Sequence, residues 1–334
     1  MKTMRLFIFF IISFLLLLSS SCSNDNKYQG IWIGSYTIVD DDSFQFTLNR
    51  IFEFTEDSLF IKELNIYDAS PIKSFSYAID GNSLIADNDT LVIEKISDDS
   101  LVLMHYDESK YTYGFIKYIP QEPISKINIQ NKAFVMKSET FIDTIDFVDS
   151  VKCLHFGNMK LNDWAVVNYK DIEVLLLEDF FSLPFTVSHN MDSIIILKNY
   201  FRGISDVELK IYDNKIDTVG LFDDWLYPNL DPNNIPPPPL PPWLCEENNY
   251  DGNVHLVIDR DSLNMIQFCC SRKNSWRFNS TKDFILIPDS LSYQKYRVLR
   301  IIENDSDNLV LKGNLHLKYY EESGVFKFGK RDNW

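Results

Sequence analysis

The 334-residue sequence has little glycine and no surplus of positive charge. Only 11 glycines occur, which leaves little material for the Gly-rich loops that bind phosphate or a dinucleotide. Lys and Arg number 32 against 48 Asp and Glu, so the net charge is −16. Nucleic acid is therefore not an expected partner, because phosphate binding needs clustered cations and an acidic field repels a polyanion.

Catalytic motifs are also missing. The sequence has no H-E-x-x-H helix motif and no G-x-S-x-G elbow. Its five histidines stand singly, at His105, His155, His189, His255 and His316. The segment from Asn304 to Asn308 is rich in Asp and Asn, yet it lacks the central Gly and the terminal Glu of a calcium loop. We therefore expect a protein that is not an enzyme and has no metal or cofactor.

Cysteine is scarce, with no C-x-x-C pair to suggest zinc. Beyond the N-terminal region the cysteines are Cys153, Cys245, Cys269 and Cys270. Neighbouring residues of a strand point to opposite faces, so Cys269 and Cys270 are not expected to bond to each other. Buried thiols and one disulfide that involves Cys245 both remain open.

The N-terminal region has the pattern of a secretion signal. Lys2 and Arg5 precede an apolar stretch from Leu6 to Leu18, and small residues then lead to Cys22. This region resembles a bacterial lipoprotein signal, although Ser19 stands where an aliphatic residue is usual. The resemblance implies a signal peptide over 1–21, lipidation of Cys22 and a tether over 22–27.

Such an anchor implies attachment to a membrane of the cell envelope, with the outer membrane as the expected one. Asp25 is the only acid in the tether, so a periplasmic face and a surface face both remain open.

A polar Asp-Ser turn before an apolar run recurs along the chain. Related strings begin near Asp57, Asp99, Asp149, Asp192, Asp261 and Asp307. They pair at intervals of about forty to fifty residues, which is the mark of an internal repeat. The alternation of apolar and polar residues between the turns predicts short antiparallel strands. The expected fold is all-β, with three tandem meander units that form small barrels or sandwiches over 28–119, 124–213 and 215–334.

A second repeated pattern joins the last two units. Asn162-Asp163-Trp164 with Lys170-Asp171-Ile172 matches Asn274-Ser275-Trp276 with Lys282-Asp283-Phe284.

In the first unit, alternating Phe44, Phe46 and Leu48 predict a half-buried strand of a hairpin.

The first unit opens with Gly30-Ile31-Trp32. This opening resembles the lipocalin-like domains of exported bacterial lipoproteins, in which the Trp closes one end of an antiparallel barrel. The resemblance implies a ligand pocket near Gly30 and Trp32 for a small apolar molecule. The alternative is a barrel filled by its own side chains, which the 25 Phe and 17 Tyr residues favour.

A proline-rich excursion interrupts the third unit over 229–244. Such a run adopts a polyproline II conformation and cannot lie within a sheet. It is either a docking segment, with Trp225, Tyr227 and Trp243 as anchors for a partner, or a rigid spacer on its own domain.

Asp followed by Ser or Thr and an aliphatic residue also resembles the O-glycosylation acceptor of exported proteins in one Gram-negative phylum. The pattern occurs at Ser58, Thr90, Ser100, Thr144, Ser150, Ser193, Thr218, Ser262 and Ser290. The structural alternative is that Asp-Ser is favourable chemistry for a hairpin turn.

Together these features predict a non-catalytic lipoprotein of the cell envelope that acts as a binding module for a protein or glycan partner. The alternative is a lipocalin-like carrier that holds a small apolar ligand in the first barrel.

Overall fold

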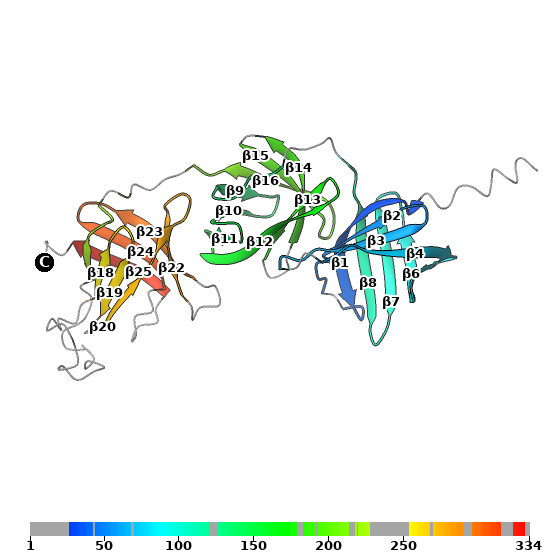
Figure 1. The fold of residues 1–334 in the computed structure, drawn as a ribbon, viewed down its shortest axis with the longest axis horizontal. Helices are drawn as coiled ribbons and strands as arrows, with labels where there is room; N and C mark the ends of the chain where they lie inside the picture. Colours follow the sequence, from blue (N-terminus) through cyan, green and yellow to red (C-terminus); the bar gives the residue numbers. More distant parts are fainter. Residues whose placement is uncertain are drawn as a thin grey trace, which may run out of the picture. The chain divides into compact units, whose positions relative to one another are not determined.

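The computed structural model describes residues 27–42, 44–67, 70–120, 126–178, 183–191, 193–213, 218, 220–227, 254–267, 270–289, 296–314 and 323–330. Every regular element among these residues is a β-strand, and neighbouring strands run antiparallel (Figure 1). The prediction of an all-β fold built from antiparallel meanders is therefore confirmed. Among the same residues, no helical segment has the length and apolar character needed to cross a membrane.

The first sheet is a closed barrel in which each strand pairs with the next and the last strand returns to the first. Its strands are β1 (Gly30–Val39), β2 (Arg50–Phe54), β3 (Ser58–Glu63), β4 (Lys73–Asp80), β5 (Ser83–Ala86), β6 (Asp89–Ile96), β7 (Ser100–Tyr106) and β8 (Lys110–Lys117). Pairing between β1 and β8 closes the ring, with a β-bulge in β1 between Gly34 and Tyr36. The bulge shifts the side chains of β1 by one position relative to β8.

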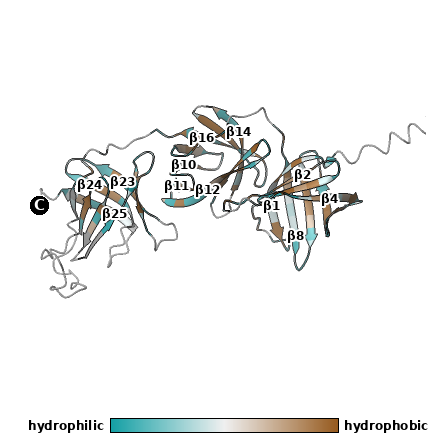
Figure 2. Cartoon of the chain, viewed as in Figure 1, coloured by the Kyte–Doolittle hydropathy of each residue, from teal (hydrophilic) through white to brown (hydrophobic). Residues whose placement is uncertain are grey.

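The alternation of residues along these strands separates an inner from an outer face (Figure 2). Trp32, Phe52 and Phe115 point inward and belong to one apolar cluster inside the barrel. Ile33 and Ile51 point outward, yet they are fully buried, because they pack in a second cluster with residues of the segment 167–200.

A polar contact accompanies this outer cluster within the same compact unit. The buried Glu53 of β2 accepts hydrogen bonds from the Tyr169 hydroxyl at 2.7 Å and from Lys170 Nζ at 2.6 Å. Tyr169 is itself buried. Burial and the Glu53 carboxylate raise the pKa of Tyr169, so the hydroxyl stays protonated and can donate this bond.

The second sheet is also a closed barrel, in which β16 returns to β9. Its strands are β9 (Ala133–Lys137), β10 (Ile142–Asp146), β11 (Lys152–His155), β12 (Lys160–Tyr169), β13 (Ile172–Leu177), β14 (Leu183–Met191), β15 (Ile194–Asn199) and β16 (Ser205–Ile211).

The third sheet has nine strands in the order β20-β19-β18-β17-β25-β24-β23-β22-β21. These are β17 (Asp224–Tyr227), β18 (Val254–Ile258), β19 (Leu263–Gln267), β20 (Cys270–Asn274), β21 (Arg277–Phe278), β22 (Phe284–Pro288), β23 (Tyr296–Asn304), β24 (Asn308–Asn314) and β25 (Ser323–Lys330). The two edge strands, β20 and β21, are consecutive in the chain. This sheet therefore follows the same meander, but its ring is open between β20 and β21.

The chain divides into two compact units. The first comprises Met1–Lys126, Ala165–Met191 and Ile195–Val207, and the second comprises Ile127–Trp164, Asp192–Ile194 and Glu208–Trp334. The domain boundaries proposed from the sequence stay a prediction.

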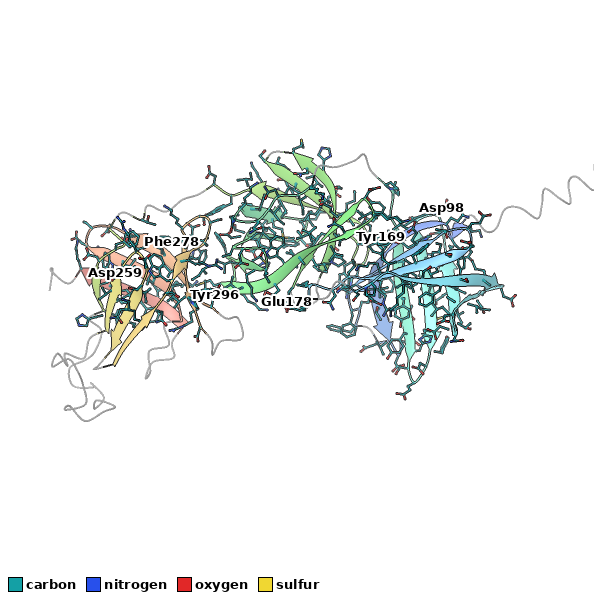
Figure 3. All side chains as sticks on the ribbon, viewed as in Figure 1. Asp98, Tyr169, Glu178, Asp259, Phe278 and Tyr296 are labelled. Atoms are coloured by element: carbon teal, nitrogen blue, oxygen red, sulfur yellow. The ribbon has the colours of Figure 1, made fainter. Side chains whose placement is uncertain are left out.

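Five of the six recurring Asp-Ser strings form one type of hairpin turn; in the sixth, Asp192 lies outside the described residues. In each of the five, the N–H of the first residue donates to the carbonyl of the fourth; the turns are Thr55–Ser58, Ser97–Ser100, Asp149–Lys152, Asp259–Ser262 and Asp305–Asn308. At the first two, the hydroxyl of the first residue also accepts from the N–H of the fourth, at 3.2 and 3.0 Å. Figure 3 labels Asp98 and Asp259, which lie in two of these turns. The turns begin with Thr, Ser or Asp because the side-chain oxygen of these residues accepts a hydrogen bond from a backbone N–H of the turn.

An aromatic side chain fixes the first carbonyl of three of these turns. Tyr77 donates its hydroxyl to the Thr55 carbonyl at 2.8 Å. The indole N–H groups of Trp164 and Trp276 donate to the carbonyls of Asp149 and Asp259, at 3.0 and 2.9 Å. The repeated Trp pattern found in the sequence is thus a turn-bracing contact.

The strand predicted around Phe44, Phe46 and Leu48 does not form, because the chain leaves the sheet at Asp40 and Asp41. Both residues adopt positive φ, and the Asp40 carboxylate accepts a hydrogen bond from the N–H of Lys110. Only a single bridge between Thr37 and Phe46 follows, and β2 begins at Arg50.

Candidate functional site

The two ends of the first barrel differ in composition. At the end where β1 begins, Trp32 is completely buried, and its indole N–H donates to the Tyr28 carbonyl at 2.7 Å. Phe54 and Leu59, beside the turn from β2 to β3, belong to the same apolar cluster. The Lys117 ammonium lies 5.2 Å from the centre of the Trp32 ring. We call this the closed end.

The opposite end contains a cavity of about 450 Å³. It lies where β1 and β3 finish and where β2 and β8 begin, and we call it the open end. Its lining residues are Thr37, Leu48, Asn49, Arg50, Glu63, Leu64, Asn65, Ser70, Tyr111 and Tyr113. Most of these side chains are polar or aromatic, so the cavity can hydrogen-bond a ligand as well as pack against it.

An ion pair forms the charged part of this cavity. Arg50 Nε lies 2.8 and 3.0 Å from the two carboxylate oxygens of Glu63. The Arg50 guanidinium also lies 6.0 Å from the centre of the Tyr113 ring, and Tyr113 stacks on Tyr111 with the planes 8° apart. Burial raises the pKa of the Tyr113 hydroxyl, so it is a neutral donor at ordinary pH.

Exposed aromatic side chains surround the open end. Phe44 and Phe46 are 54% and 45% exposed, and their ring centres are 5.7 Å apart. Tyr106, at the end of β7, is 59% exposed. Aromatic side chains that remain in solvent next to a cavity are typical of binding surfaces.

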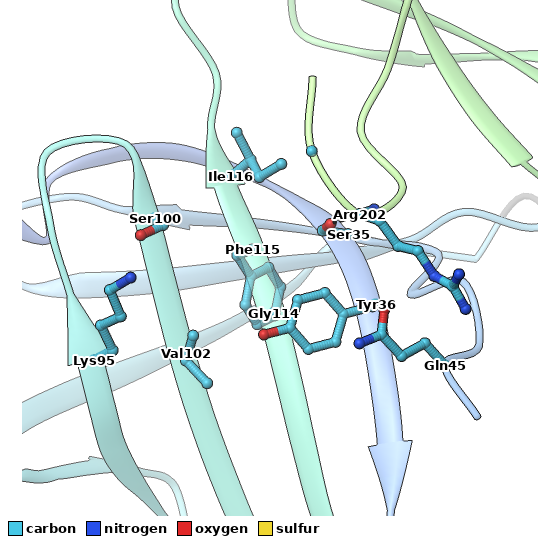
Figure 4. A pocket seen from close by; sticks show the side chains of 11 residues that line it. Ser35, Tyr36, Gln45, Lys95, Ser100, Val102, Gly114, Phe115, Ile116 and Arg202 are labelled. Atoms are coloured by element: carbon cyan, nitrogen blue, oxygen red, sulfur yellow. Dashed lines mark hydrogen bonds between the residues drawn. The ribbon is translucent and has the colours of Figure 1, made fainter. Parts of the chain in front are cut away.

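A second hollow lies on the outer face of the first barrel (Figure 4). It has a volume of about 580 Å³, and we call it the Tyr36 groove. Its lining residues are Ser35, Tyr36, Gln45, Lys95, Ser100, Val102, Gly114, Phe115, Ile116, Arg202 and Gly203.

Tyr36 lies directly on the backbone of Gly114, its partner across the ladder. A Cβ atom at Gly114 would come within 2.3 Å of Tyr36 Cε1, so only glycine fits under the ring. The groove therefore has a flat aromatic floor.

Ser35, one residue earlier in the bulge of β1, holds the loop that carries Arg202. Its hydroxyl donates to the Tyr200 carbonyl at 2.5 Å and accepts from the Arg202 N–H at 3.2 Å. Ser35 is buried, and Arg202 adopts a φ of 59°, which a non-glycine residue keeps only when its surroundings fix it. The Arg202 side chain thus starts from a fixed backbone position.

Gly30 and Trp32, proposed as a pocket from the sequence, lie at the closed end. Trp32 packs within the apolar cluster and lines neither of the two hollows. The residues that do line the cavity at the open end were not identified from the sequence. Alternation of Tyr111 and Tyr113 along a strand was the one signal available for them.

Trp225 and Tyr227 do not provide the exposed anchors proposed for them. Trp225 is 0% exposed, and its indole N–H donates to the Leu221 carbonyl at 3.1 Å. Tyr227 is half-buried and packs against Phe326 and Phe328, with ring centres 5.8 and 5.5 Å apart. Both residues belong to β17 and face the core of the third sheet, which explains their burial. Trp243 and the proline-rich segment 229–244 lie outside the described residues.

The proposed O-glycosylation residues differ in exposure. Thr90, Ser150 and Ser193 are exposed, whereas Ser58, Ser100, Thr144 and Thr218 are half-buried. Ser262 is buried, so its hydroxyl is closed to a transferase in the folded chain. Ser290 lies outside the described residues, and glycan attachment at the exposed positions stays a prediction.

The lipidation residue Cys22 and the cysteines Cys245 and Cys269 also lie outside the described residues. Cys153 is buried in β11. For Cys270, only the backbone of β20 is described.

One histidine contacts an acid in a way that resembles part of a catalytic triad. His155 Nδ1 lies 3.0 Å from the Asp143 carboxylate, and Nε2 is buried without a hydrogen-bond partner in the described part of the chain. A general base must reach a substrate or a nucleophile. The buried Nε2 atom of His155 does not meet this requirement in the structure. Within the same residues, no group of three His, Cys, Asp or Glu side chains could hold a metal ion.

Comparisons with known proteins give no family assignment. No protein-family model matches the sequence, and no curated protein matches it. Among solved structures, an uncharacterized protein from Bacteroides eggerthii is 17% identical, covers 27% of this chain and 99% of its own, and has a TM-score of 0.22.

Transferrin binding protein B from Neisseria meningitidis is 8% identical over 84% of this chain and 65% of its own, with a TM-score of 0.15. The protein of that name from Haemophilus parasuis is 9% identical over 90% and 75%, with a TM-score of 0.17. Similarities this weak carry no argument about function.

Proposed function

We propose that this chain is a non-catalytic lipoprotein of the cell envelope, anchored through Cys22, that binds a protein partner at the open end of its first barrel. The observation that carries the proposal is the pair of exposed rings, Phe44 and Phe46, beside a cavity of about 450 Å³. Aromatic side chains that fill or surround a pocket dominate the binding energy of protein interfaces.

The topology of the barrel supports this location. The chain enters β1 at the closed end and reaches Phe44 only after β1 has finished. A tether at the N-terminus therefore joins the barrel at the end opposite the exposed rings. This arrangement leaves the open end away from the point of attachment to the anchor.

The same cavity supports a second candidate function, a carrier of a small ligand. The cavity is lined by the Arg50–Glu63 ion pair, by amide side chains and by stacked tyrosines, whereas Trp32, Phe52 and Phe115 pack together in the apolar cluster inside the barrel. A ligand held there would therefore carry polar groups, unlike the small apolar ligand that the lipocalin-like resemblance implies. A glycan would also satisfy this lining.

Photo-crosslinking in the native host tests the proposal. A benzophenone amino acid in place of Tyr106 should form a crosslink to a protein partner in intact membranes. The control is the same probe in place of Ile119, which is 71% exposed and follows β8 at the closed end. Replacing Phe44 and Phe46 by Ser should reduce the Tyr106 crosslink more than tenfold, because each aromatic ring that a partner covers contributes on the order of 1–2 kcal/mol. Equal crosslinking at both probe positions, or a yield unchanged by the Ser substitutions, would contradict the proposal.

A further inference from the structure

We propose that the Tyr36 groove is a second, separate binding site, which takes an acidic oligosaccharide and holds its anionic groups with Lys95 and Arg202. The two cations come from different parts of the first compact unit, β6 and the loop before β16. Figure 4 shows them on opposite sides of the Tyr36 ring.

The groove is positively charged, unlike the chain as a whole. None of the eleven described residues that line it is acidic, although the whole chain has a net charge of −16. Lys95 and Arg202 are exposed and form no ion pair with any residue in the described ranges. Other cations of the same unit are paired, such as Arg50 with Glu63 and Lys110 with Asp41.

Two acids are next to lining residues in the chain: Glu94 precedes Lys95 at a bulge in β6, and Asp99 precedes Ser100. Glu94 raises the pKa of Tyr36, after the larger effect of burial, but neither acid lines the groove. The groove itself therefore presents two positive charges to a ligand.

The uncharged part of the lining indicates the class of ligand. The Tyr36 ring lies between the two cations, with Ser100 on the side of Lys95 and Gln45 on the side of Arg202 (Figure 4). A sugar ring offers C–H groups to an aromatic face and hydroxyls to amide and hydroxyl groups. Carboxylate or sulfate groups on neighbouring sugars would then pair with Lys95 and Arg202.

The closed barrel disfavours an acidic peptide. Extended peptides bind by adding a strand to an unpaired sheet edge. Here β1, β6, β7 and β8 each have strand neighbours on both sides, so no such edge lies at the groove. Recognition must come from side chains, which suits a polyhydroxylated anion better than a peptide backbone.

The groove is also pre-formed. Ser35 fixes the backbone of the Arg202 loop, and Tyr36 is held against Gly114. Ser35 and Tyr36 both lie in the bulge of β1. This one bulge therefore places the aromatic floor of the groove and also the loop that carries Arg202.

Isothermal titration calorimetry with the full chain tests the inference. The probes are tetragalacturonate, sulfated maltohexaose, neutral maltohexaose and tetraglutamate. We expect at least one of the two acidic sugars to bind and neutral maltohexaose not to bind. Whether tetragalacturonate or sulfated maltohexaose binds shows whether the groove takes carboxylate or sulfate groups. Higher salt should weaken this binding, because part of it is electrostatic.

The variant Lys95→Met/Arg202→Met should lose about tenfold or more in affinity, since both charge-assisted contacts are removed. Lys73→Met removes one exposed charge from the same barrel and should leave the affinity unchanged. Circular dichroism should confirm that every variant keeps its β-sheet content. Binding of tetraglutamate alone would overturn the assignment to a saccharide, and an equal loss in Lys73→Met would overturn the site.

The proposal is independent of the open end. Phe44→Ser/Phe46→Ser should leave the affinity for acidic sugars unchanged. Failure of sugar binding would not affect the crosslinking result at Tyr106, so the two proposals can fail separately.

Discussion

The two ends of the first barrel are built from the same strands but for different purposes. At the closed end, Trp32 and Phe54 are buried, and the hydrogen-bonding group of the indole is satisfied by a backbone carbonyl. At the open end, Arg50 and Glu63 are 38% and 34% exposed, and Phe44 and Phe46 stay in solvent. The closed end therefore contributes stability, whereas the open end leaves apolar and charged groups available for a partner.

The largest change in stability is expected at the closed end. Replacing Trp32 by Ala should lower the free energy of unfolding by about 3–5 kcal/mol, because a large buried side chain leaves a cavity. The Tyr28 carbonyl would also lose its donor. Urea denaturation measures this change, and the milder Trp32→Phe variant separates packing from the lost hydrogen bond. A loss below about 1 kcal/mol would show that this end is not the stabilising one.

A smaller change in stability, with a larger change in binding, is expected at the open end. Arg50→Met should lower the free energy of unfolding by no more than about 1 kcal/mol, because exposed ion pairs contribute little to stability. It should nevertheless reduce the Tyr106 crosslink, since the charged part of the cavity is lost. Glu63→Gln is the matched control for the other half of the pair. Thermal unfolding and crosslink yield, measured on the same samples, test whether binding changes more than stability. If Arg50→Met reduced the crosslink no more than Trp32→Phe does, the two ends would not differ in function.

The smallest effect is expected with alkaline pH. Burial raises the pKa of Tyr113 in the folded chain above the unfolded value of about 10. The contribution of Tyr113 is therefore fully present below about pH 10 and is lost as the pH rises through its folded pKa. Tyr113→Phe should lose less stability between about pH 9 and 11 than the original chain. Urea midpoints across this range measure the effect, and parallel pH profiles for the two proteins would contradict it.

Much of the fold could be predicted because its signals are local. The Asp-Ser strings mark hairpin turns, since a side-chain oxygen at the first position accepts from an N–H three residues later. Strands such as β5 and β18 follow from the alternation of apolar and polar residues between such turns. The Trp164 and Trp276 pattern is local in the same sense, because each indole reaches a turn fewer than twenty residues earlier.

The candidate sites could not be predicted because they depend on distant contacts. Arg202 lines the Tyr36 groove, and its N–H donates a hydrogen bond to Ser35, which lies 167 residues earlier in the chain. Trp225 has an aromatic neighbour and precedes a proline-rich run, which suggested exposure, yet pairing of β17 with β18 and β25 places it in a core. Phe44 and Phe46 alternate like strand residues, and nothing in their spacing shows that β1 has already ended.

Native mass spectrometry of the protein purified from its own membranes tests the central claim most directly. The intact complex is compared with the denatured chain and with the Phe44→Ser/Phe46→Ser variant. We expect a protein partner that is bound non-covalently to the original chain, is lost on denaturation and is absent from the variant. A small apolar molecule released on denaturation from both proteins, with no protein partner, would contradict it and would favour a carrier.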